Sequence, residues 1–226
     1  MGYFLATQAT RRLVPLPVIQ NIVFDMDGVL ADTSSIHAQA YDKLWAHVGL
    51  AGPNYPSIAG RSTKDVVSEQ TRSLLPSAQD LEKWINFKQK HALELIRVTN
   101  TLYDEIPSVI ADLTRKAIRC SVATSASHQS ATAILGQSNL IDKFVRIITA
   151  KDVKTAKPSP EGFLLAMRQS QFDPNATLII EDSSNGIQAA LASNAWVISV
   201  RSDISVEHEH FIGSYSSITR AMRDLL

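Results

Sequence analysis

A short apolar run at residues 22–24, followed at once by Asp25, Asp27 and Gly28, constrains what this chain can fold into more than any other stretch. The β-favouring run indicates a buried strand, and the acidic pair with its glycine indicates a turn at the strand end, where α/β proteins keep their chemistry. In extended backbone the two carboxylates would converge and repel each other unless a divalent cation lay between them, and Mg²⁺ suits all-oxygen ligands. The alternative is that Asp25 and Asp27 serve only as turn and helix-cap residues.

Beyond this turn the chain carries helical spacing and no convincing strand as far as about residue 100. Apolar residues recur every three or four positions in 33–49 and again from residue 60 to Leu74. Ser77 and Asp80 then have the spacing of a capping box, which predicts a third helix carrying apolar residues as far as Ile96.

From about Tyr103 onward the pattern changes to strands alternating with helices. Such alternation predicts a parallel, doubly wound α/β sheet covered on both faces, here with five strands including 22–24. The expected elements are helix 106–116, strand 118–123, helix 130–135, strand 144–148, a helix with Ser159 as its cap and Pro160 in its first turn, strand 177–180, helix 186–193 and strand 196–200.

The position of the helical block suggests how the chain is divided. We expect an α/β core formed by residues 19–32 and 104–226, with residues 33–103 inserted as a small all-helical cap subdomain. Residues 1–18 are expected to be an N-terminal extension that leads into the first strand.

Charge and cysteine content exclude several classes of protein. The 22 Lys and Arg residues equal the 22 Asp and Glu residues, so no overall field draws the chain to nucleic acid or to an anionic membrane. The single cysteine, Cys120, excludes an internal disulfide framework, and inside an apolar run it is expected to be a buried structural thiol. No run approaches the ~20 apolar residues of a membrane span, and the amino terminus has the wrong charge order for a secretory signal. We expect a cytoplasmic protein, monomeric or weakly homodimeric, without nucleic-acid or membrane partners.

Three further polar signals follow at or near strand ends. The second strand leads into Thr124 and Ser125, whose hydroxyl and amide groups could hold an anion at a helix start, although helix capping alone accounts for them. Lys157 lies in a loop stiffened by two prolines, where a lysine is otherwise ordinary surface. The fourth strand ends in Glu181 and Asp182, a second acidic pair that can also be a cap. Together with the first acidic pair, these signals make four that fall at one end of one predicted sheet, so they are not independent coincidences.

In this order the motifs resemble the signature of the haloacid dehalogenase (HAD) superfamily of phosphotransferases. The resemblance covers about residues 20–202 and is greatest to the branch that contains β-phosphoglucomutase and phosphoglycolate phosphatase. It implies a Rossmann-like core with a small helical cap inserted after the first motif. The residues that carry it are Phe-Asp25-Met-Asp27-Gly28-Val, Ala-Thr124-Ser125, Ala-Lys157-Pro-Ser-Pro and Ile-Glu181-Asp182-Ser-Ser-Asn-Gly186-Ile.

The resemblance also implies roles for the acidic residues. Asp25 would attack the phosphorus of a monoester and become an aspartyl phosphate. Asp27 would protonate the leaving oxygen and then activate the attacking water. Asp25, the backbone carbonyl of Asp27, and Asp182 would hold Mg²⁺, with Glu181 either a ligand or a support behind the ligands.

The phosphoryl oxygens would be bound by Thr124, the amide of Ser125 and Lys157. These groups are needed because two anions must approach closely, so the lysine and Mg²⁺ cancel repulsion and stabilise the charge on the transferring group.

The acid at position 27 narrows the choice within the superfamily. Halide-releasing and phosphonate-cleaving enzymes of the superfamily that this chain resembles generally lack this acid, because their leaving groups do not need its proton. The presence of Asp27 therefore favours a phosphate ester as the substrate. A catalytically inactive phosphometabolite-binding protein is the alternative from another class, and the complete set of core residues argues against it.

Two candidate substrate-binding residues fall in the expected cap. His37 resembles the cap-hinge histidine of β-phosphoglucomutase-like enzymes, and the alternative is a helix-surface histidine with no role. Lys88 aligns roughly with a substrate-facing cap lysine of that branch, and the alternative is a solvated helix face.

Gly60 and Arg61 belong to a segment that resembles the cap loop that meets the substrate. Here the sequence departs from the mutase pattern, because Thr63 or Lys64 stands where an arginine is expected and Arg61 lies earlier. A mutase must grip the second phosphate of a sugar bisphosphate, a task suited to arginine's forked donors. We therefore expect hydrolysis of a small phosphorylated metabolite first, and β-phosphoglucomutase-type sugar phosphate mutation second.

Overall fold

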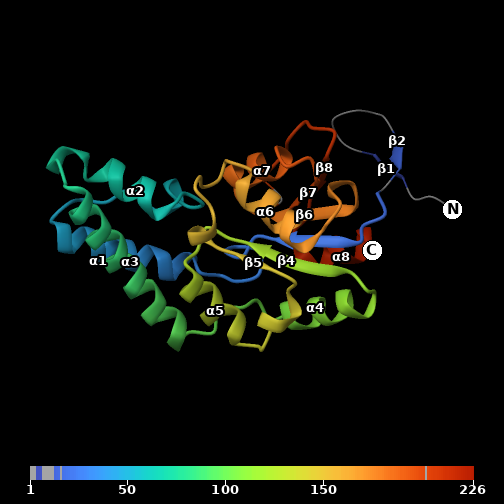
Figure 1. Ribbon diagram of the computed structural model, residues 1–226, viewed down its shortest axis with the longest axis horizontal. Coiled ribbons are helices and arrows are strands. Elements are labelled where there is room, and N and C mark those ends of the chain that lie inside the picture. The colour runs from blue at the N-terminus through green and yellow to red at the C-terminus, as the bar shows by residue number, and fades with distance from the viewer. Residues whose placement is uncertain (1–3, 7–12, 16, 202) are drawn as a thin grey trace.

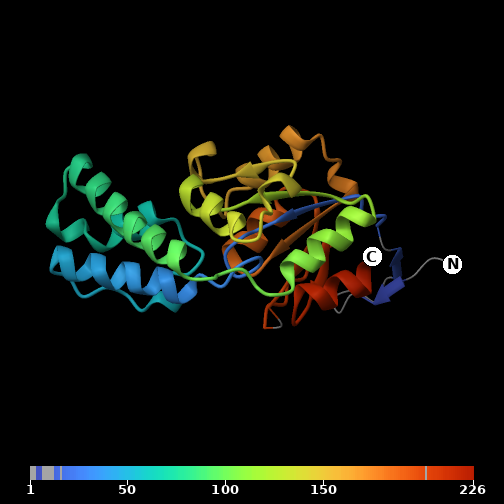
Figure 2. The ribbon, with the colours of Figure 1, turned by 90° about the horizontal axis from the view of Figure 1, so that it is seen from below.

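The computed structural model describes residues 4–6, 13–15, 17–201 and 203–226. Figures 1 and 2 show an elongated molecule, with a sheet and its covering helices at one end and helices α1, α2 and α3 at the other. The carboxyl terminus lies at the sheet end, far from these three helices.

Six strands form one parallel sheet in the order β5-β4-β3-β6-β7-β8. The expected doubly wound α/β fold is therefore confirmed. The strand that carries the first acidic motif, β3, is central, and Phe24 at its end pairs with Val122 of β4 and Ile180 of β6. This register brings the three strand-end motifs to one edge of the sheet. The strands are β3 (Asn21–Phe24), β4 (Arg119–Ala123), β5 (Ile147–Ile148), β6 (Thr177–Glu181), β7 (Trp196–Ser199) and β8 (Phe211–Ser214).

Both faces of the sheet are covered, because each buried strand alternates apolar side chains between them. Ile22 and Phe24 pack on one face, and Val23 packs on the other. The first face is covered by α4 (Ile106–Arg115), α5 (His128–Gly136) and α8 (Ile218–Leu225), and the second by α6 (Glu161–Ser170) and α7 (Ser184–Leu191).

Several expected bounds need correction. The sheet has a sixth strand, β8, which the sequence pattern did not reveal because the strand is short and contains Gly213. Helix α8 was also not expected. The strand expected over 144–148 is reduced to Ile147–Ile148. Helix α6 begins at Glu161 with Pro160 at its N-cap, so Ser159 is not the cap. Single turns of 3₁₀ helix occur at Tyr55–Ser57, Arg72–Leu74, Ile141–Lys143, Ala150–Asp152 and Pro174–Ala176.

The three remaining helices form a layer with an apolar cluster of their own, which includes Leu44, Ile58 and Val67. The expected capping box is confirmed, since Ser77 and Asp80 exchange hydrogen bonds between side chain and backbone at 3.2 Å. These helices are α1 (Ser34–Val48), α2 (Thr63–Gln70) and α3 (Ala78–Val98).

The chain enters and leaves this helical layer through two adjacent segments. The Asp32 amide donates to the Thr101 carbonyl at 2.8 Å, and the Tyr103 amide donates to the Leu30 carbonyl at 3.1 Å. The division into a core of 19–32 and 104–226 and a cap of 33–103 stays a prediction. We call the helical layer formed by α1, α2 and α3, with the loops that join them, the cap.

The expected N-terminal extension, residues 1–18, is only partly described. Strands β1 (Phe4–Ala6) and β2 (Leu13–Pro15) pair antiparallel, while residues 1–3, 7–12 and 16 lie outside the described part of the chain. No helix of the described residues is both long enough and apolar enough to cross a membrane.

Candidate active site

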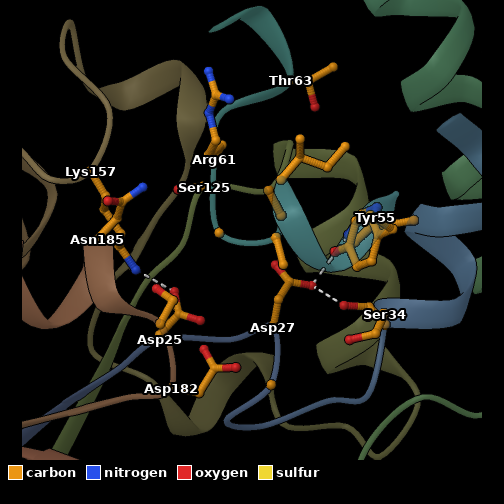
Figure 3. Close-up of a pocket in the computed structure, with 18 of the residues that line it drawn as sticks. Asp25, Asp27, Ser34, Tyr55, Arg61, Thr63, Ser125, Lys157, Asp182 and Asn185 are labelled. Carbon is orange, nitrogen blue, oxygen red and sulfur yellow. Dashed lines mark hydrogen bonds and ion pairs between the residues drawn. The ribbon is translucent and has the colours of Figure 1, made fainter. Parts of the chain in front are cut away.

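A cavity of about 330 Å³ lies between the carboxyl ends of the strands and the cap (Figure 3). Its core wall includes Asp25, Asp27 and Lys157, and its cap wall includes His37 and Lys88. The volume is near the lower end of the range of about 300–1,000 Å³ for ligand pockets, which suits a small metabolite.

Lys157 joins two of the expected acidic residues on the core wall. Its Nζ donates to Asp25 and, at 2.6 Å, to Glu181 Oε1. Burial alone would lower the pKa of Lys157, but the attraction of the two carboxylates outweighs it and raises the pKa. Burial raises the pKa of Asp25 well above its ordinary value, against the lowering effect of Lys157. The loop lysine is thus part of a buried charge cluster and is not ordinary surface.

The second oxygen of Glu181 is held by backbone. Glu181 Oε2 accepts hydrogen bonds from the amides of Asp182 and Ser183, each at 2.8 Å. Gly186 lies directly against this carboxylate, since a Cβ there would be 1.7 Å from Glu181 Oε1. The glycine of the fourth motif is therefore required by close approach, and Glu181 has little freedom to move.

Three carboxylates on the core wall could hold a divalent cation. Asp25, Glu181 and Asp182 each offer an oxygen within 4.8 Å of the others. Burial and the nearby Glu181 raise the pKa of Asp182 to about 7, a sign of uncompensated negative charge. Gly28, with φ of +81°, keeps the space beside Asp182 open, because a Cβ would lie 2.0 Å from Asp182 Oδ2. The donor set and its open cradle fit a hard cation such as Mg²⁺.

Asp27 turns away from this trio toward the cap, so the two carboxylates of the first motif do not converge as they would in extended backbone (Figure 3). Thr33 Oγ1 donates to Asp27 Oδ1 at 2.5 Å, and His37 Nε2 lies 3.5 Å from the same oxygen. Burial would raise the pKa of Asp27, but the contacts with His37 and Thr33 outweigh it and lower the pKa.

The second motif lies beside Asp27. Thr124 Oγ1 is 3.4 Å from Asp27 Oδ2 and accepts a hydrogen bond from the Ala126 amide at 3.0 Å. Ser125 lines the cavity next to it. The expected cap of the following helix is formed by Ser127, which accepts from the Ser130 amide.

The cap wall carries a buried lysine. Lys88 is only 4% exposed, so the alternative of a solvated helix face is wrong. Its Nζ lies 3.0 Å from His37 Nδ1 and 4.5 Å from the centre of the Tyr41 ring. Burial lowers the pKa of Lys88 to about 8.

His37 links Lys88 to Asp27. An ammonium group can only donate, so His37 Nδ1 accepts from Lys88 and the ring proton is on Nε2, facing Asp27. Burial and the charge of Lys88 lower the pKa of His37, which favours this neutral form. The alternative of a histidine on the open helix surface is wrong.

The cap loop that contains Gly60 and Arg61 touches the core. Gly60 has φ of +77°, and a Cβ there would lie 3.0 Å from Ser183 Cβ. Arg61 lines the cavity, but its Nη2 donates to Glu69 Oε2 at 2.5 Å. The closeness of the cap loop to the fourth motif explains why the cavity is bounded on both sides.

Some lining residues were not expected from the sequence. Tyr55 and Arg201 face the cavity from a cap loop and from the end of β7. Neither lies in a periodic element or a recognisable motif, so no sequence signal singled them out. Cys120 is buried away from these groups, and burial raises the pKa of its thiol to about 12, as expected of a structural thiol.

Comparison with known proteins agrees with this geometry. A family model for haloacid dehalogenase-like hydrolases matches residues 22–200. The chain is 29% identical over 176 residues to a phosphorylated carbohydrates phosphatase from Thermotoga maritima, covering 76% of this chain and 80% of that protein. It is 28% identical over 190 residues to the fructose-1-phosphate phosphatase YqaB of Escherichia coli, covering 80% and 95%.

Solved structures show the same relationship. A β-phosphoglucomutase from Clostridium difficile superposes with a TM-score of 0.74 at 26% identity, covering 80% of this chain and 84% of that one. The family match extends over most of the chain and includes every strand-end motif that faces the cavity. The chain therefore belongs to the haloacid dehalogenase-like hydrolases.

Proposed function

We propose that this protein is a Mg²⁺-dependent phosphatase that hydrolyses a small phosphorylated metabolite through an aspartyl phosphate on Asp25. The observation that carries the proposal is the division of labour between the two aspartates. Asp25 is bonded to Lys157 beside an acidic trio, while Asp27 faces the cap across the same cavity. This arrangement supports Asp25 as the nucleophile and Asp27 as the proton-transfer group.

The reaction has two steps. A carboxylate oxygen of Asp25 attacks phosphorus, the bond from phosphorus to the leaving oxygen breaks, and Asp27 gives that oxygen a proton. Water then attacks the aspartyl phosphate, Asp27 takes a proton from the water, and the bond between phosphorus and Asp25 breaks to release phosphate. Lys157, Thr124 and the amide of Ser125 bind the phosphoryl oxygens during both steps.

The metal would be held by Asp25, the backbone carbonyl of Asp27, and Asp182, with Glu181 as a further ligand or as a support. When bound, Mg²⁺ supplies positive charge that cancels repulsion between the nucleophile and the phosphate. Members of the family generally use Mg²⁺, and the acidic trio is the feature of this chain that supports it.

Asp27 must be protonated to act first as an acid, although its contacts lower its pKa. A phosphate dianion bound beside it has the opposite effect, because a like charge favours the neutral carboxyl. Asp27 therefore takes up its proton as substrate binds, and after the first step it is again suited to act as a base toward water.

A sugar phosphate is the substrate class that the relatives support, since two of them are named as phosphatases of phosphorylated carbohydrates and of fructose 1-phosphate. The second candidate is a β-phosphoglucomutase-type mutase, favoured by the similarity to the Clostridium difficile enzyme. Thr63 or Lys64 in place of the expected arginine argues for hydrolysis. An inactive binding protein is disfavoured because Asp25, Asp27, Lys157 and Asp182 all line one cavity, which supports a catalytic role for them.

Phosphate release from a panel of phosphorylated metabolites tests the proposal, with Mg²⁺ present and with Asp25→Asn as the inactive control. We expect release by the native protein that EDTA abolishes and that the variant lacks. Incubation with β-glucose 1-phosphate and a trace of its 1,6-bisphosphate tests the mutase. Formation of glucose 6-phosphate faster than free phosphate would reverse the order of the two candidates.

A further inference from the structure

Two arginines line the cavity among the described residues, and each is held by a carboxylate of its own neighbourhood. Arg61 Nη2 donates to Glu69 Oε2 at 2.5 Å. Arg201 donates to Asp203 through two parallel bonds, from Nε at 3.0 Å and from Nη2 at 2.5 Å. Each of these two arginines is thus paired with a carboxylate before a ligand arrives.

The lysines of the cavity do not replace these arginines. Lys157 is engaged by Asp25 and Glu181 at the reacting end. Lys88 is buried against His37, so its charge lies close to Asp27 and not at the entrance. A second anionic group on a substrate would therefore meet arginines whose positive charge is already offset by a carboxylate.

The orientation of Arg61 also bears on how a second anionic group would be received. In the view of Figure 3 its side chain extends away from Asp27, toward the side of the cavity where Thr63 lies. Glu69 is half exposed, so its negative charge also acts on any anion that approaches this side. The remaining groups on the cap wall include the uncharged donors Tyr55, Ser57 and Gln89, which suit hydroxyl groups.

We propose that Glu69 is a specificity-determining residue that, by pairing with Arg61, selects phosphomonoesters with an uncharged leaving group and disfavours substrates with a second anionic group. The inference rests on the proposed function, because it concerns the leaving-group side of the same cavity. Asp203 has the same effect on Arg201 from the core side. Substrates with two phosphates lose affinity, because the carboxylate beside each arginine offsets the positive charge that would attract the second phosphate.

Binding and turnover of a matched pair of sugars test this, with fructose 1-phosphate and fructose 1,6-bisphosphate as probes. Dissociation constants are measured by calorimetry with Mg²⁺ in the Asp25→Asn background, so that turnover does not consume the probe. We expect tighter binding of the monophosphate. Replacing Glu69→Gln in that background is expected to lower the ratio of the bisphosphate constant to the monophosphate constant about fivefold.

Two controls separate the local effect of Glu69 on Arg61 from the general effect of removing one negative charge. Glu82→Gln changes the same charge on an exposed part of the cap, and the ratio should stay as it was. The double change Arg61→Gln with Glu69→Gln should return the ratio to that of the parent, because the arginine whose charge Glu69→Gln leaves uncompensated is also removed. Three outcomes would each overturn the inference. The first is an equal ratio for Glu69→Gln and Glu82→Gln, the second is tighter binding of the bisphosphate by the parent, and the third is no binding of either sugar.

Phosphate release by the native protein distinguishes failure of the proposed function from failure of the role of Glu69. Binding that follows the expected ratios without release of phosphate from the monophosphate would contradict the proposed function and leave the role of Glu69 supported. Release from both sugars with equal kcat/KM would support the phosphatase and contradict the role of Glu69.

Discussion

The core wall and the cap wall of the cavity each bury one lysine, in opposite electrostatic settings. Lys157 lies between the carboxylates of Asp25 and Glu181, which raise its pKa despite burial. Lys88 lies against a neutral imidazole and an aromatic ring, and burial lowers its pKa to about 8. The first charge is paired with two carboxylates, while the second has no carboxylate within 4 Å among the described residues.

The difference between the walls matches the proposed division of tasks. The core wall must hold a phosphoryl group and a metal whatever the substrate, so its charges are fixed by several partners. In the proposed function the cap wall meets the part of the substrate that differs among relatives, and we propose that Lys88, which has no carboxylate partner among the described residues, binds it. Four substitutions break or sharpen this contrast.

Removing the core lysine is expected to have the largest effect. Lys157→Met leaves Asp25 and Glu181 buried without their cation, which costs about 3–5 kcal/mol of folding free energy and lowers kcat/KM by about 10³-fold or more. Thermal unfolding and phosphate release measure the two effects, and added Mg²⁺ should restore part of the stability. Lys154→Met, in the exposed part of the same loop, is the matched control. A Lys157→Met variant as stable as this control would contradict the buried cluster.

Asp27 lies between the walls, so its removal tests proton transfer without removing either lysine. Asp27→Ala is expected to lower kcat by about 10²–10⁴-fold while Mg²⁺ and inorganic phosphate still bind. Steady-state kinetics and calorimetry with each ligand separate these quantities. Unchanged turnover would refute the assignment of Asp27 as acid and base, and loss of Mg²⁺ binding would show that its side chain matters to the metal.

Removing the cap lysine should weaken binding yet stabilise the fold. Lys88→Met is expected to raise KM about tenfold, with a smaller change in kcat, because a charged hydrogen bond to substrate is lost. The pKa of Lys88 falls from 10.5 to about 8 on folding, so burial of its charge costs on the order of 3 kcal/mol at neutral pH. Urea unfolding at pH 7 should therefore show a more stable variant. Lys90→Met, exposed on the same helix, is the control.

The sign of the pH dependence follows from the same shift. Below about pH 8 Lys88 is charged in the folded state, and the full cost of burying that charge is present. Between about 8 and 10.5 the unfolded chain binds more protons than the folded one, so the contribution of Lys88 to stability rises with pH. Substrate affinity should fall over the same pH range, because Lys88 loses the charge that binds the substrate. KM should therefore rise above about pH 8 in the native protein but not in Lys88→Met.

Tyr55 provides the smallest expected effect. Tyr55 lines the cavity from the cap, and burial raises the pKa of its hydroxyl further above the ordinary value, so the group is uncharged. Tyr55→Phe should raise KM about threefold at unchanged kcat, the loss expected for one neutral hydrogen bond. Michaelis–Menten kinetics with fructose 1-phosphate would measure it. A larger effect on kcat than on KM would contradict a role in binding alone and would indicate that Tyr55 takes part in the reaction.

The strand-end motifs could be found from sequence because local patterns encode them. Asp25, Thr124 and Glu181 each follow a run of β-favouring apolar residues, and parallel strands bring their carboxyl ends to one edge. The fold class, the helical insertion and the core residues of the site followed from that regularity. Strand β8 and helix α8 did not, because the strand is short and paired through a bulge at Val197 and Ile198.

The sequence by itself determined which charged residues line the core wall, because that set depends on residue type and on position at or near the ends of regular strands. Only the tertiary structure decided the state of the charged groups. Lys88 and Lys157 are the same residue type, and their opposite pKa shifts arise from neighbours distant in sequence. The pairing of Arg61 with Glu69 was likewise visible only in three dimensions, because electrostatic energy depends on distances between side chains and on their burial.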